Sequence, residues 1–371
     1  MKAVAVFPQQ RQVRVTDHPE PRLESPKQIR VRVLDVGVCG TDREIAEFQY
    51  GTPPKGFDHL VIGHEALSEV VETGAEASRV KKGDLVVLTV RRPCPEMCIA
   101  CRQGRQDFCY TGDFTERGIK ERHGYMTEFV VEDEQYAWRV PPELREIAVL
   151  TEPLTIAEKG LEQLWQVQQR LPWACEADAA KKGPGECHHA LVLGAGPVGL
   201  LGAMALRLYG FNTTIYSRAK PGDHREDVAH AIGATFINAY DVPVSDLAKE
   251  IGAIDVVYEA VGASKLAFDV IPQLGNNAVF IFTGVPGRKG PIEVPTDTIM
   301  RDMVLKNQLI FGTVNASPTA FESAIRSLGC FMQRWPDAVR TLITKRYPIE
   351  RAPELLGEDF GGIKNVVAIA S

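Results

Sequence analysis

The sequence lacks the features that would direct the chain to nucleic acid, a membrane or secretion. Its 42 Lys and Arg residues face 48 Asp and Glu residues, for a formal net charge of −6. An acidic chain has no electrostatic attraction for nucleic acid or for an anionic membrane. No hydrophobic run approaches the roughly 20 residues that span a bilayer. Met1-Lys2 leads directly into the alternating segment 3–7, without a signal-peptide pattern. We therefore expect a cytoplasmic protein with no nucleic-acid or membrane partner.

The length and composition are those of an ordinary globular protein. The chain has 371 residues, of which 44% are hydrophobic and 24% are charged. At roughly 100–200 residues per domain, this length predicts two domains.

Four residues from separate segments have the chemistry of a catalytic zinc site. Cys39, His64, Glu65 and Glu152 offer a thiolate, an imidazole and two carboxylates, which are the donor groups of open zinc sites. The alternative is that Cys39 is a small core residue and that His64-Glu65 is a surface pair. Because the segments are far apart in the sequence, only the fold can bring them together.

Four further cysteines are clustered, which predicts a second and different metal site. They lie within residues 94–109: Cys94, Cys98, Cys101 and Cys109. In a large chain without a signal peptide such a cluster favours metal over disulfides. Four thiolates leave no open position, so we expect a structural zinc, the alternative being reduced thiols in a surface loop.

The N-terminal half is predicted to be a β domain. Short apolar segments such as 29–34 and 85–88 alternate with Gly and Pro turns, which indicates a small barrel-like domain. Cys39 and His64 follow predicted strands. Glu116 lies in a polar loop, where it is either a functional acid or a solvated one.

A glycine-rich turn in the second half predicts a dinucleotide site. The buried strand 190–193 runs into Gly194-Ala195-Gly196-Pro197-Val198-Gly199, and a helix follows over 200–209. A strand before G-x-G-x-x-G and a helix after it are the context that this motif requires. The glycines allow close approach of a pyrophosphate, and the helix N-terminus stabilises its charge. The alternative is an ordinary turn with packing glycines.

The end of the next strand, 213–216, decides between the two nicotinamide cofactors. An Asp or Glu there would bind the ribose 2′-hydroxyl of NAD, but the sequence has Ser217, Arg218, Ala219 and Lys220. Arg218 can bind a 2′-phosphate through two hydrogen bonds, and Lys220 adds positive charge. We therefore favour NADP, the alternative being that Arg218 is only a surface cation.

Six strands in all are predicted for this half, which is the number in a full doubly wound fold. Thr283 and Val285 follow one strand and Thr313 and Asn315 follow another, near the expected nicotinamide position. Before this half, a helix is expected over 157–169 and a linker over 172–185. Cys175 and Cys187 flank the linker and are predicted to be free thiols. The tail after residue 316 should return to the first domain.

These motifs together resemble the zinc-dependent medium-chain dehydrogenase/reductase superfamily over essentially the whole chain, and within it the archaeal-type glucose (aldose) 1-dehydrogenase branch. The segments that carry the resemblance are 38–44 (VCGTDRE), 60–66 (LVIGHEA), 89–93 (TVRRP), 104–109 (GRQDFC), 116–119 (ERGI), 152–154 (EPL) and 158–159 (EK).

The resemblance implies a role for each matching residue. Cys39, His64, Glu65 and Glu152 match the catalytic zinc shell, and the cysteine cluster matches the structural zinc, giving two zinc ions per chain. Thr41 matches the residue whose hydroxyl contacts the reacting alcohol. Glu116, Glu152 and Asn315 match sugar-binding positions, and Ser217 with Arg218 matches the 2′-phosphate site.

The sequence departs from the family pattern at several positions. The first gap of the cysteine cluster has three residues, where two are usual, so Cys94 needs a wider loop. Ser68 replaces a usual Gly, and Glu44 stands where alcohol-oxidising relatives have a relay His. Ala219 replaces a second phosphate-binding Arg, and Leu305 lies near the place of a sugar-contacting His.

The resemblance implies an α/β protein with a doubly wound Rossmann domain (188–314) and a GroES-like β-barrel catalytic domain (1–187 and 315–371) that carries the structural-zinc lobe. The implied activity is oxidation of an aldose at C1 to the aldonolactone, with hydride transfer to NADP or NAD, by a homodimer or homotetramer. The alternatives are an alcohol or polyol dehydrogenase of the same superfamily, and a non-catalytic dinucleotide-sensing protein, whose expected mark is loss of the metal ligands.

Overall fold

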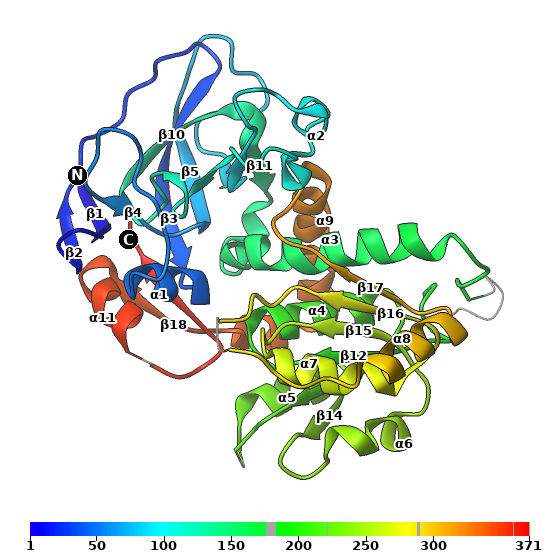
Figure 1. Ribbon diagram of the computed structural model, residues 1–371. Helices are drawn as coiled ribbons and strands as arrows, with labels where there is room; N and C mark the ends of the chain where they lie inside the picture. Colours follow the sequence, from blue (N-terminus) through cyan, green and yellow to red (C-terminus); the bar gives the residue numbers. More distant parts are fainter. Residues whose placement is uncertain (176–182, 221, 288–289, 359, 371) are drawn as a thin grey trace. The chain divides into compact units, whose positions relative to one another are not determined.

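A computed structural model of the chain describes residues 1–175, 183–220, 222–287, 290–358 and 360–370 (Figure 1). The chain forms two compact units. Unit 1 comprises Met1–Thr155, Asn315–Gly329 and Arg340–Ser371, and unit 2 comprises Ile156–Val314 and Cys330–Val339. The division at residue 187 expected for the domains stays a prediction; the compact units divide within the helix 151–168.

Unit 1 is built from three β-sheets, as expected for a GroES-like domain. A three-stranded sheet has the order β2-β1-β4, from β1 (Lys2–Phe7), β2 (Gln12–Asp17) and β4 (Leu60–Val61). A seven-stranded sheet joins β11 (Ala137–Val140), β6 (Leu85–Leu88), β5 (Glu65–Thr73), β3 (Gln28–Gly37), β19 (Lys364–Ala368) and β18 (Ile343–Pro348) in that order, and β10 (Phe129–Asp133) pairs with β3. The third sheet contains β7 (Arg91–Arg92), β8 (Thr115–Arg117) and β9 (Glu121–Arg122).

Helices in unit 1 are short, and the longer ones continue into unit 2. The short helices are α1 (Gly40–Ala46), α2 (Ile99–Arg102) and α11 (Ala352–Gly357). Three further helices have residues in both units: α3 (Thr151–Gln168), α9 (Pro318–Arg334) and α10 (Pro336–Thr341). The tail returns to the seven-stranded sheet of unit 1, where β19 pairs antiparallel with β3.

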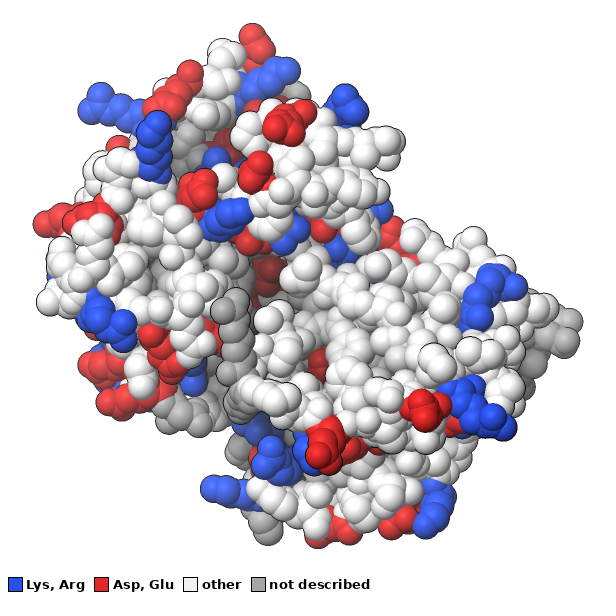
Figure 2. Space-filling model, viewed as in Figure 1, with Lys and Arg blue, Asp and Glu red and all other residues white. Residues whose placement is uncertain are grey.

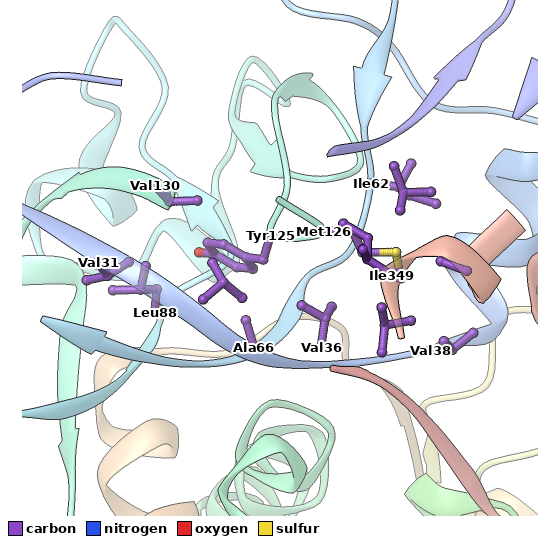
Figure 3. Close-up of a cluster of buried hydrophobic side chains, with 14 of the residues drawn as sticks. Val31, Val36, Val38, Ile62, Ala66, Leu88, Tyr125, Met126, Val130 and Ile349 are labelled. Atoms are coloured by element: carbon purple, nitrogen blue, oxygen red, sulfur yellow. The ribbon is translucent and has the colours of Figure 1, made fainter. Parts of the chain in front are cut away.

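The core of unit 1 is an aliphatic cluster between the sheets (Figure 3). Val31 and Val36 of β3 lie with Leu88 and Tyr125 in its interior. The Tyr125 ring is fully buried, and its hydroxyl donates to the Thr89 carbonyl at 3.1 Å. Alternation along β3 directs Val31 inward, and a register shift between Val33 and Asp35 brings Val36 to the same cluster. The strand that leads to Cys39 is therefore anchored by the core.

Unit 2 is a parallel sheet with helices between its strands. The strand order is β14-β13-β12-β15-β16-β17, which is the doubly wound arrangement predicted from the six apolar segments. The strands are β12 (His189–Leu193), β13 (Asn212–Ser217), β14 (Thr235–Asn238), β15 (Ile254–Glu259), β16 (Leu274–Phe282) and β17 (Leu309–Gly312). The helices are α4 (Pro197–Leu208), α5 (His224–Ala231), α6 (Leu247–Ile251), α7 (Ser264–Val270) and α8 (Thr296–Leu305).

Two cysteines in unit 2 differ from their predicted state. Cys175 and Cys187 were expected to be free thiols, but they form a disulfide with a Cα–Cα distance of 5.8 Å. The prediction was wrong because the disulfide depends on how the chain folds back beside Cys175. The Cys175 N–H donates to the Pro184 carbonyl there, and local sequence does not reveal this contact. Residues 176–182 of the predicted linker lie outside the described part of the chain.

Neither sign of charge gathers into one large patch on the face shown in Figure 2, where basic and acidic side chains are interspersed on both units. Among the described residues, no helix combines the length and the apolar character needed to cross a membrane.

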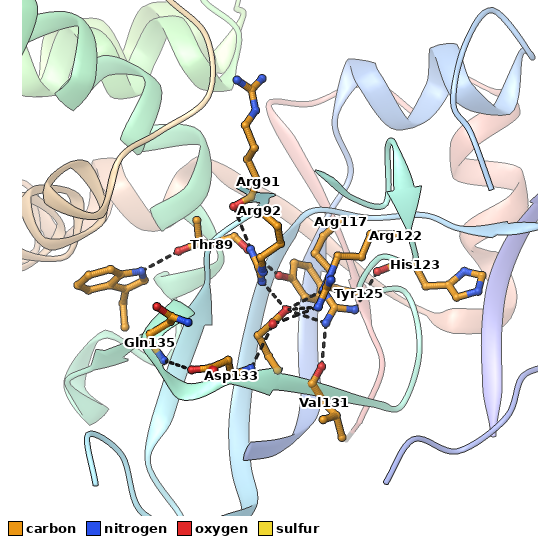
Figure 4. A network of polar contacts seen from close by, with 12 residues as sticks. Thr89, Arg91, Arg92, Arg117, Arg122, His123, Tyr125, Val131, Asp133 and Gln135 are labelled. Atoms are coloured by element: carbon orange, nitrogen blue, oxygen red, sulfur yellow. Dashed lines mark hydrogen bonds and ion pairs between the residues drawn. The ribbon is translucent and has the colours of Figure 1, made fainter. Parts of the chain in front are cut away.

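A buried ionic network ties β10 to the segment that carries Glu116 (Figure 4). The Glu132 carboxylate on β10 accepts hydrogen bonds from Arg92, from Arg117 at 2.7 Å and from Arg122 at 3.1 Å. Burial alone would raise the pKa of Glu132, but the three guanidinium groups hold it well below its ordinary value. Glu132 therefore pairs with three cations, of which Arg92 and Arg117 are buried and Arg122 is half-buried.

We predict that Glu132→Gln lowers the free energy of unfolding by about 3–5 kcal/mol, because it leaves buried guanidinium groups unpaired. Because the pKa of Glu132 is lower in the folded state than in the unfolded chain, its ionised form stabilises the fold at pH values above the unfolded-state pKa. This contribution to the free energy of unfolding is lost progressively as the pH falls below about 4.5. Urea denaturation at pH 7 and pH 4 measures both effects. Glu350→Gln, which breaks an exposed pair with Lys2, is the control and should change little; equal losses in the two variants would contradict the prediction.

Candidate active site

The first part of the site is the N-terminus of α1. Cys39 caps this helix, and the Asp42 side chain in its first turn accepts the Cys39 N–H at 2.9 Å. This is the reciprocal arrangement of a capping box, with a thiol in place of the usual hydroxyl. The Cys39 backbone is thereby fixed at the point where the chain leaves β3.

Asp42 also fixes the turn that carries His64. Its Oδ1 atom accepts the Gly63 N–H at 3.2 Å and lies 3.2 Å from His64 Nδ1. The Asp42 side chain is fully buried. Burial would lower the pKa of His64, but Asp42 and Cys39 together raise it well above its ordinary value. A carboxylate on one ring nitrogen of a histidine leaves the other nitrogen to face a metal.

The second buried carboxylate, Glu65, is held by a lysine from the far end of the chain. Lys364 on β19 donates to Glu65 Oε1 at 2.8 Å, to Glu65 Oε2 at 2.6 Å and to the Val38 carbonyl at 3.1 Å. Gly37 faces Glu65 across the β3–β5 pair, and a Cβ atom there would lie 2.1 Å from Glu65 Oε2. The close approach of Glu65 therefore requires glycine at position 37.

The structure brings three of the four predicted ligands into one compact set. One ligand atom each from Cys39, His64 and Glu65 lie within 4.8 Å of one another. Thiolate, imidazole and carboxylate are the donors of an open zinc site, so the residues present fit this metal. Glu152, in the first turn of α3, is outside this compact set. Burial, opposed by His64 and reinforced by Glu65, raises the pKa of Glu152 to about 7, so its carboxyl interacts with the same groups.

The four clustered cysteines also come together. Cys94 Sγ lies 3.7 Å from Cys101 Sγ, and Cys98 Sγ lies 4.0 Å from Cys109 Sγ. Zn–S bonds of about 2.3 Å at tetrahedral angles separate two sulfurs by about 3.8 Å. The wider first gap does not exclude Cys94, since all four side chains belong to one set. The cluster fits a closed zinc site.

Two of the residues predicted to bind sugar hydroxyls contact each other in unit 1. Asn315 Nδ2 donates to Glu116 Oε1 at 2.9 Å, and Arg91 Nε donates to the same oxygen at 3.0 Å. Asn315 is held in the left-handed region, with φ of 61°, a conformation that asparagine tolerates better than most residues. Glu116 is therefore a buried, oriented carboxylate and not a solvated loop acid.

Thr41 lies in the first turn of α1, two residues after Cys39. Tyr50 lies near Thr41 and Glu44, and its partial burial raises the pKa of its hydroxyl to about 12. Tyr50 is thus a neutral hydroxyl beside the residue expected to contact the reacting oxygen.

The glycine-rich turn of unit 2 leaves space on the side where a pyrophosphate would bind. Gly194 has φ of 97°, and a Cβ atom at Gly199 would lie 2.1 Å from the Gly194 carbonyl oxygen. A Cβ atom at Gly196 would meet nothing within 4 Å. Gly196 caps α4, and Pro197 and Val198 form its first turn, in which Pro is favoured. The turn therefore fits a phosphate at a helix N-terminus.

The end of β13 presents cations, as predicted. Ser217 Oγ accepts the Ala195 N–H at 3.3 Å, and Arg218 and Lys220 are exposed. Ala219 is buried, so it contributes no charge to this surface.

The other predicted cofactor residues lie at the ends of β16 and β17. Thr283 donates from its hydroxyl to the Glu259 carbonyl at 2.7 Å, and Val285 is 72% exposed. Thr313 accepts a hydrogen bond from Gln163 at 2.6 Å. Glu259 is itself buried, and its carboxylate accepts the backbone N–H groups of Val261 and Gly262 at 2.8 and 2.7 Å.

Sequence reasoning missed the residues that support this site, chiefly Asp42, Lys364 and Arg91. Asp42 had a local signal, because an acid three residues after a helix cap is the second half of a capping box. Lys364 had none, since it meets Glu65 across 299 residues of sequence.

Comparisons with known proteins agree with this geometry. A family described as "Alcohol dehydrogenase GroES-like domain" matches residues 25–142, and "Glucose dehydrogenase C-terminus" matches residues 145–369. Glucose 1-dehydrogenase of Methanocella arvoryzae is 38% identical over 372 residues, with 100% of both chains covered. Glucose 1-dehydrogenase of Thermoproteus tenax is also 38% identical and covers 100% of this chain and 99% of its own.

Solved structures give the same assignment. Haloferax mediterranei glucose dehydrogenase, in complex with NADP, Zn and gluconolactone, matches with a TM-score of 0.88 and 32% identity, covering 100% of both chains. Galactitol-1-phosphate dehydrogenase of Escherichia coli, at 19% identity and a TM-score of 0.79 over 100% of both chains, shares the fold. The chain therefore belongs to the zinc-dependent medium-chain dehydrogenase/reductase superfamily, in its glucose 1-dehydrogenase branch.

Proposed function

We propose that the protein oxidises an aldose of the glucose or galactose type at C1 to the aldonolactone, and that the hydride passes to NADP, with NAD as a second acceptor. The observation that carries the proposal is the Glu116–Asn315 pair, an oriented carboxylate and amide in the same unit as the Cys39, His64 and Glu65 donor set. The relatives named glucose 1-dehydrogenase support the same assignment. A site that holds several hydroxyls favours a sugar over a simple alcohol.

Two zinc ions per chain follow from the two donor sets. Cys39 and His64 would hold the catalytic ion, with Glu65 and Glu152 as further ligands, and the four clustered cysteines would hold the structural ion. Bound zinc supplies Lewis-acid polarisation of the reacting hydroxyl oxygen, which lowers the pKa of that hydroxyl.

The chain's own residues position the substrate and the ligands. Thr41 would hydrogen-bond the reacting oxygen. The Glu116 and Glu152 carboxylates would accept hydrogen bonds from the sugar hydroxyls, and the Asn315 amide would donate to them or accept from them. Arg91 donates a hydrogen bond to the Glu116 carboxylate and so fixes its orientation. Lys364 and Asp42 orient Glu65 and His64 before the substrate arrives, which reduces the reorganisation needed during the reaction.

The cofactor would lie along the ends of the parallel strands. The turn formed by Gly194, Gly196, Pro197, Val198 and Gly199 would bind the pyrophosphate. Ser217 and Arg218 would bind the 2′-phosphate, and Thr283, Val285, Thr313 and Asn315 would border the nicotinamide.

We further propose a homodimer or homotetramer in the cytoplasm. Met300, Val304 and Leu305 give α8 an exposed apolar face, which is typical of a protein interface. The metal-binding cysteines must stay reduced, which favours the cytoplasm.

A substrate panel tests the proposed activity. Initial rates of NADP reduction with D-glucose, D-galactose, sorbitol, threonine and ethanol should give the highest kcat/KM for an aldose, by about 100-fold over sorbitol. Glu116→Gln should lower kcat/KM for that aldose about 10- to 100-fold, through loss of a charged hydrogen bond. Glu121→Gln, on the exposed neighbouring strand, is the matched control. A preference for sorbitol or ethanol would support the polyol or alcohol dehydrogenase alternative, and no turnover of any substrate would favour the dinucleotide-sensing one.

Replacement of Arg218 tests the cofactor assignment. Arg218→Ala should raise the KM for NADP about 10- to 100-fold, because it removes a charge-assisted contact with the 2′-phosphate, and should leave the KM for NAD nearly unchanged. Lys265→Ala, an exposed cation of the same unit that pairs with Asp269, should change neither constant. Equal effects of Arg218→Ala on NADP and NAD would contradict the assignment.

A further inference from the structure

Three histidines of unit 1 gather away from both predicted zinc sites. His18 follows β2, His59 precedes β4 and His123 follows β9. One ring nitrogen from each lies within 4.8 Å of the other two. We propose that His18, His59 and His123 form a third metal site, which binds one zinc ion. The proposal goes beyond the proposed function, since none of these residues belongs to the catalytic or the structural set.

The spacing of the first two rings is that of two ligands on one ion. His18 Nδ1 lies 3.3 Å from His59 Nε2. Zn–N bonds of about 2.0–2.1 Å at tetrahedral angles separate two nitrogens by about 3.3–3.4 Å. An ion can therefore occupy the position between these rings with little movement of either.

A carboxylate fixes the tautomer of His59 that metal binding needs. Asp58 Oδ1 lies 2.9 Å from His59 Nδ1, and the hydrogen bond lowers the pKa of Asp58. With its proton on Nδ1, His59 presents the lone pair of Nε2 toward His18. Histidine ligands usually donate their second N–H to a carboxylate or a carbonyl in this way.

The third ring contributes an unused nitrogen. His123 Nε2 is buried and has no hydrogen-bond partner among the described residues. His123 Nδ1 accepts the Val61 N–H at 3.1 Å, so coordination through Nε2 moves a proton to Nδ1 and breaks this bond. The zinc–nitrogen bond that forms in its place offsets the loss of this hydrogen bond.

The surroundings of the cluster favour the neutral form of two of its rings, those of His18 and His123. Phe57 packs against His123 and His59 with ring centroids at 4.5 and 5.5 Å, and Phe7 lies 5.1 Å from His59. Burial and the neighbouring histidines lower the pKa of His18 to about 4 and of His123 to about 3. Neutral rings in an apolar shell are the form in which histidine binds metal.

A zinc ion here would link three separate loops of unit 1. One of them continues through Val61 to His64. Another follows β9, the strand that pairs with the Glu116 strand β8, and there the His123 carbonyl accepts a hydrogen bond from Arg117 at 3.0 Å (Figure 4). We expect the ion to stabilise unit 1 without entering the reaction.

Metal content of the full chain tests the proposal. After equilibration with ZnCl2 and removal of free ion, inductively coupled plasma mass spectrometry should find one equivalent fewer in His18→Gln and in His59→Gln than in the unchanged chain. His224→Gln, at an exposed histidine of α5, should keep the unchanged content. Equal content in all four proteins would overturn the proposal, as would loss only in His224→Gln, which indicates an adventitious surface ion.

A measurement on the unchanged chain covers the case in which a variant does not fold. Nitrogen-15 NMR of the imidazoles during ZnCl2 addition should show three histidines, other than His64, shifting together as one equivalent binds. The proposal fails if no such group shifts. Neither readout uses activity, so an inactive protein would count against the proposed function and not against this site.

Discussion

The site depends on buried carboxylates that need positively charged partners. Asp42 and Glu65 are almost completely buried beside Cys39, and Glu152 interacts electrostatically with them. Lys364 supplies one positive charge, and its Nζ atom contacts both Glu65 oxygens. Buried charges of one sign are costly unless they are paired or bind a metal. A divalent cation held by Cys39 and His64 would add positive charge beside the carboxylates of Asp42, Glu65 and Glu152. The metal and its supporting carboxylates are therefore mutually dependent.

The same supporting arrangement extends from the proposed metal ligands to the residues proposed to bind the sugar. Glu132 holds Arg117, which begins the turn after Glu116, and Arg91 fixes the Glu116 carboxylate from the neighbouring strand. Asn315, which starts the return of the chain to unit 1, completes this set through its contact with Glu116. Buried ionic contacts thus orient the residues that we propose to contact substrate. Because these side chains are already ordered, they lose little conformational entropy when a ligand binds.

Local patterns were sufficient to predict the fold and the ligand types. The six apolar segments of unit 2 form the parallel sheet of a doubly wound fold, and Gly194, Gly196 and Gly199 occupy the turn between β12 and α4. The segments around Cys39, His64 and the cysteine cluster predicted donor sets that the structure brings together. These features depend on residues close in sequence, where spacing and chemistry are directly visible.

Features that depend on tertiary pairing could not be predicted in this way. Lys364 reaches Glu65 only because β19 adds to β3, and the Cys175–Cys187 disulfide depends on the path of the chain between them. The roles of Thr41, Glu152 and the cofactor residues stay predictions, because each depends on where substrate and cofactor bind and not on contacts within the chain. The histidine cluster had no sequence signal, since its members come from three loops that only the sheets bring together.

The zinc affinity of an Asp42→Asn variant tests the central claim most directly. The amide keeps the size of the side chain but removes the charge that faces His64, so we predict that zinc binds the Cys39–His64 site about 10- to 100-fold more weakly. Competition with a chelator measures the dissociation constant of zinc at this site. The zinc equivalent that is absent from a Cys39→Ala variant identifies the ion of this site, and the zinc of the four-cysteine cluster serves as the internal control. A folded Asp42→Asn protein with unchanged affinity at this site would contradict the claim that the buried carboxylate organises the metal centre.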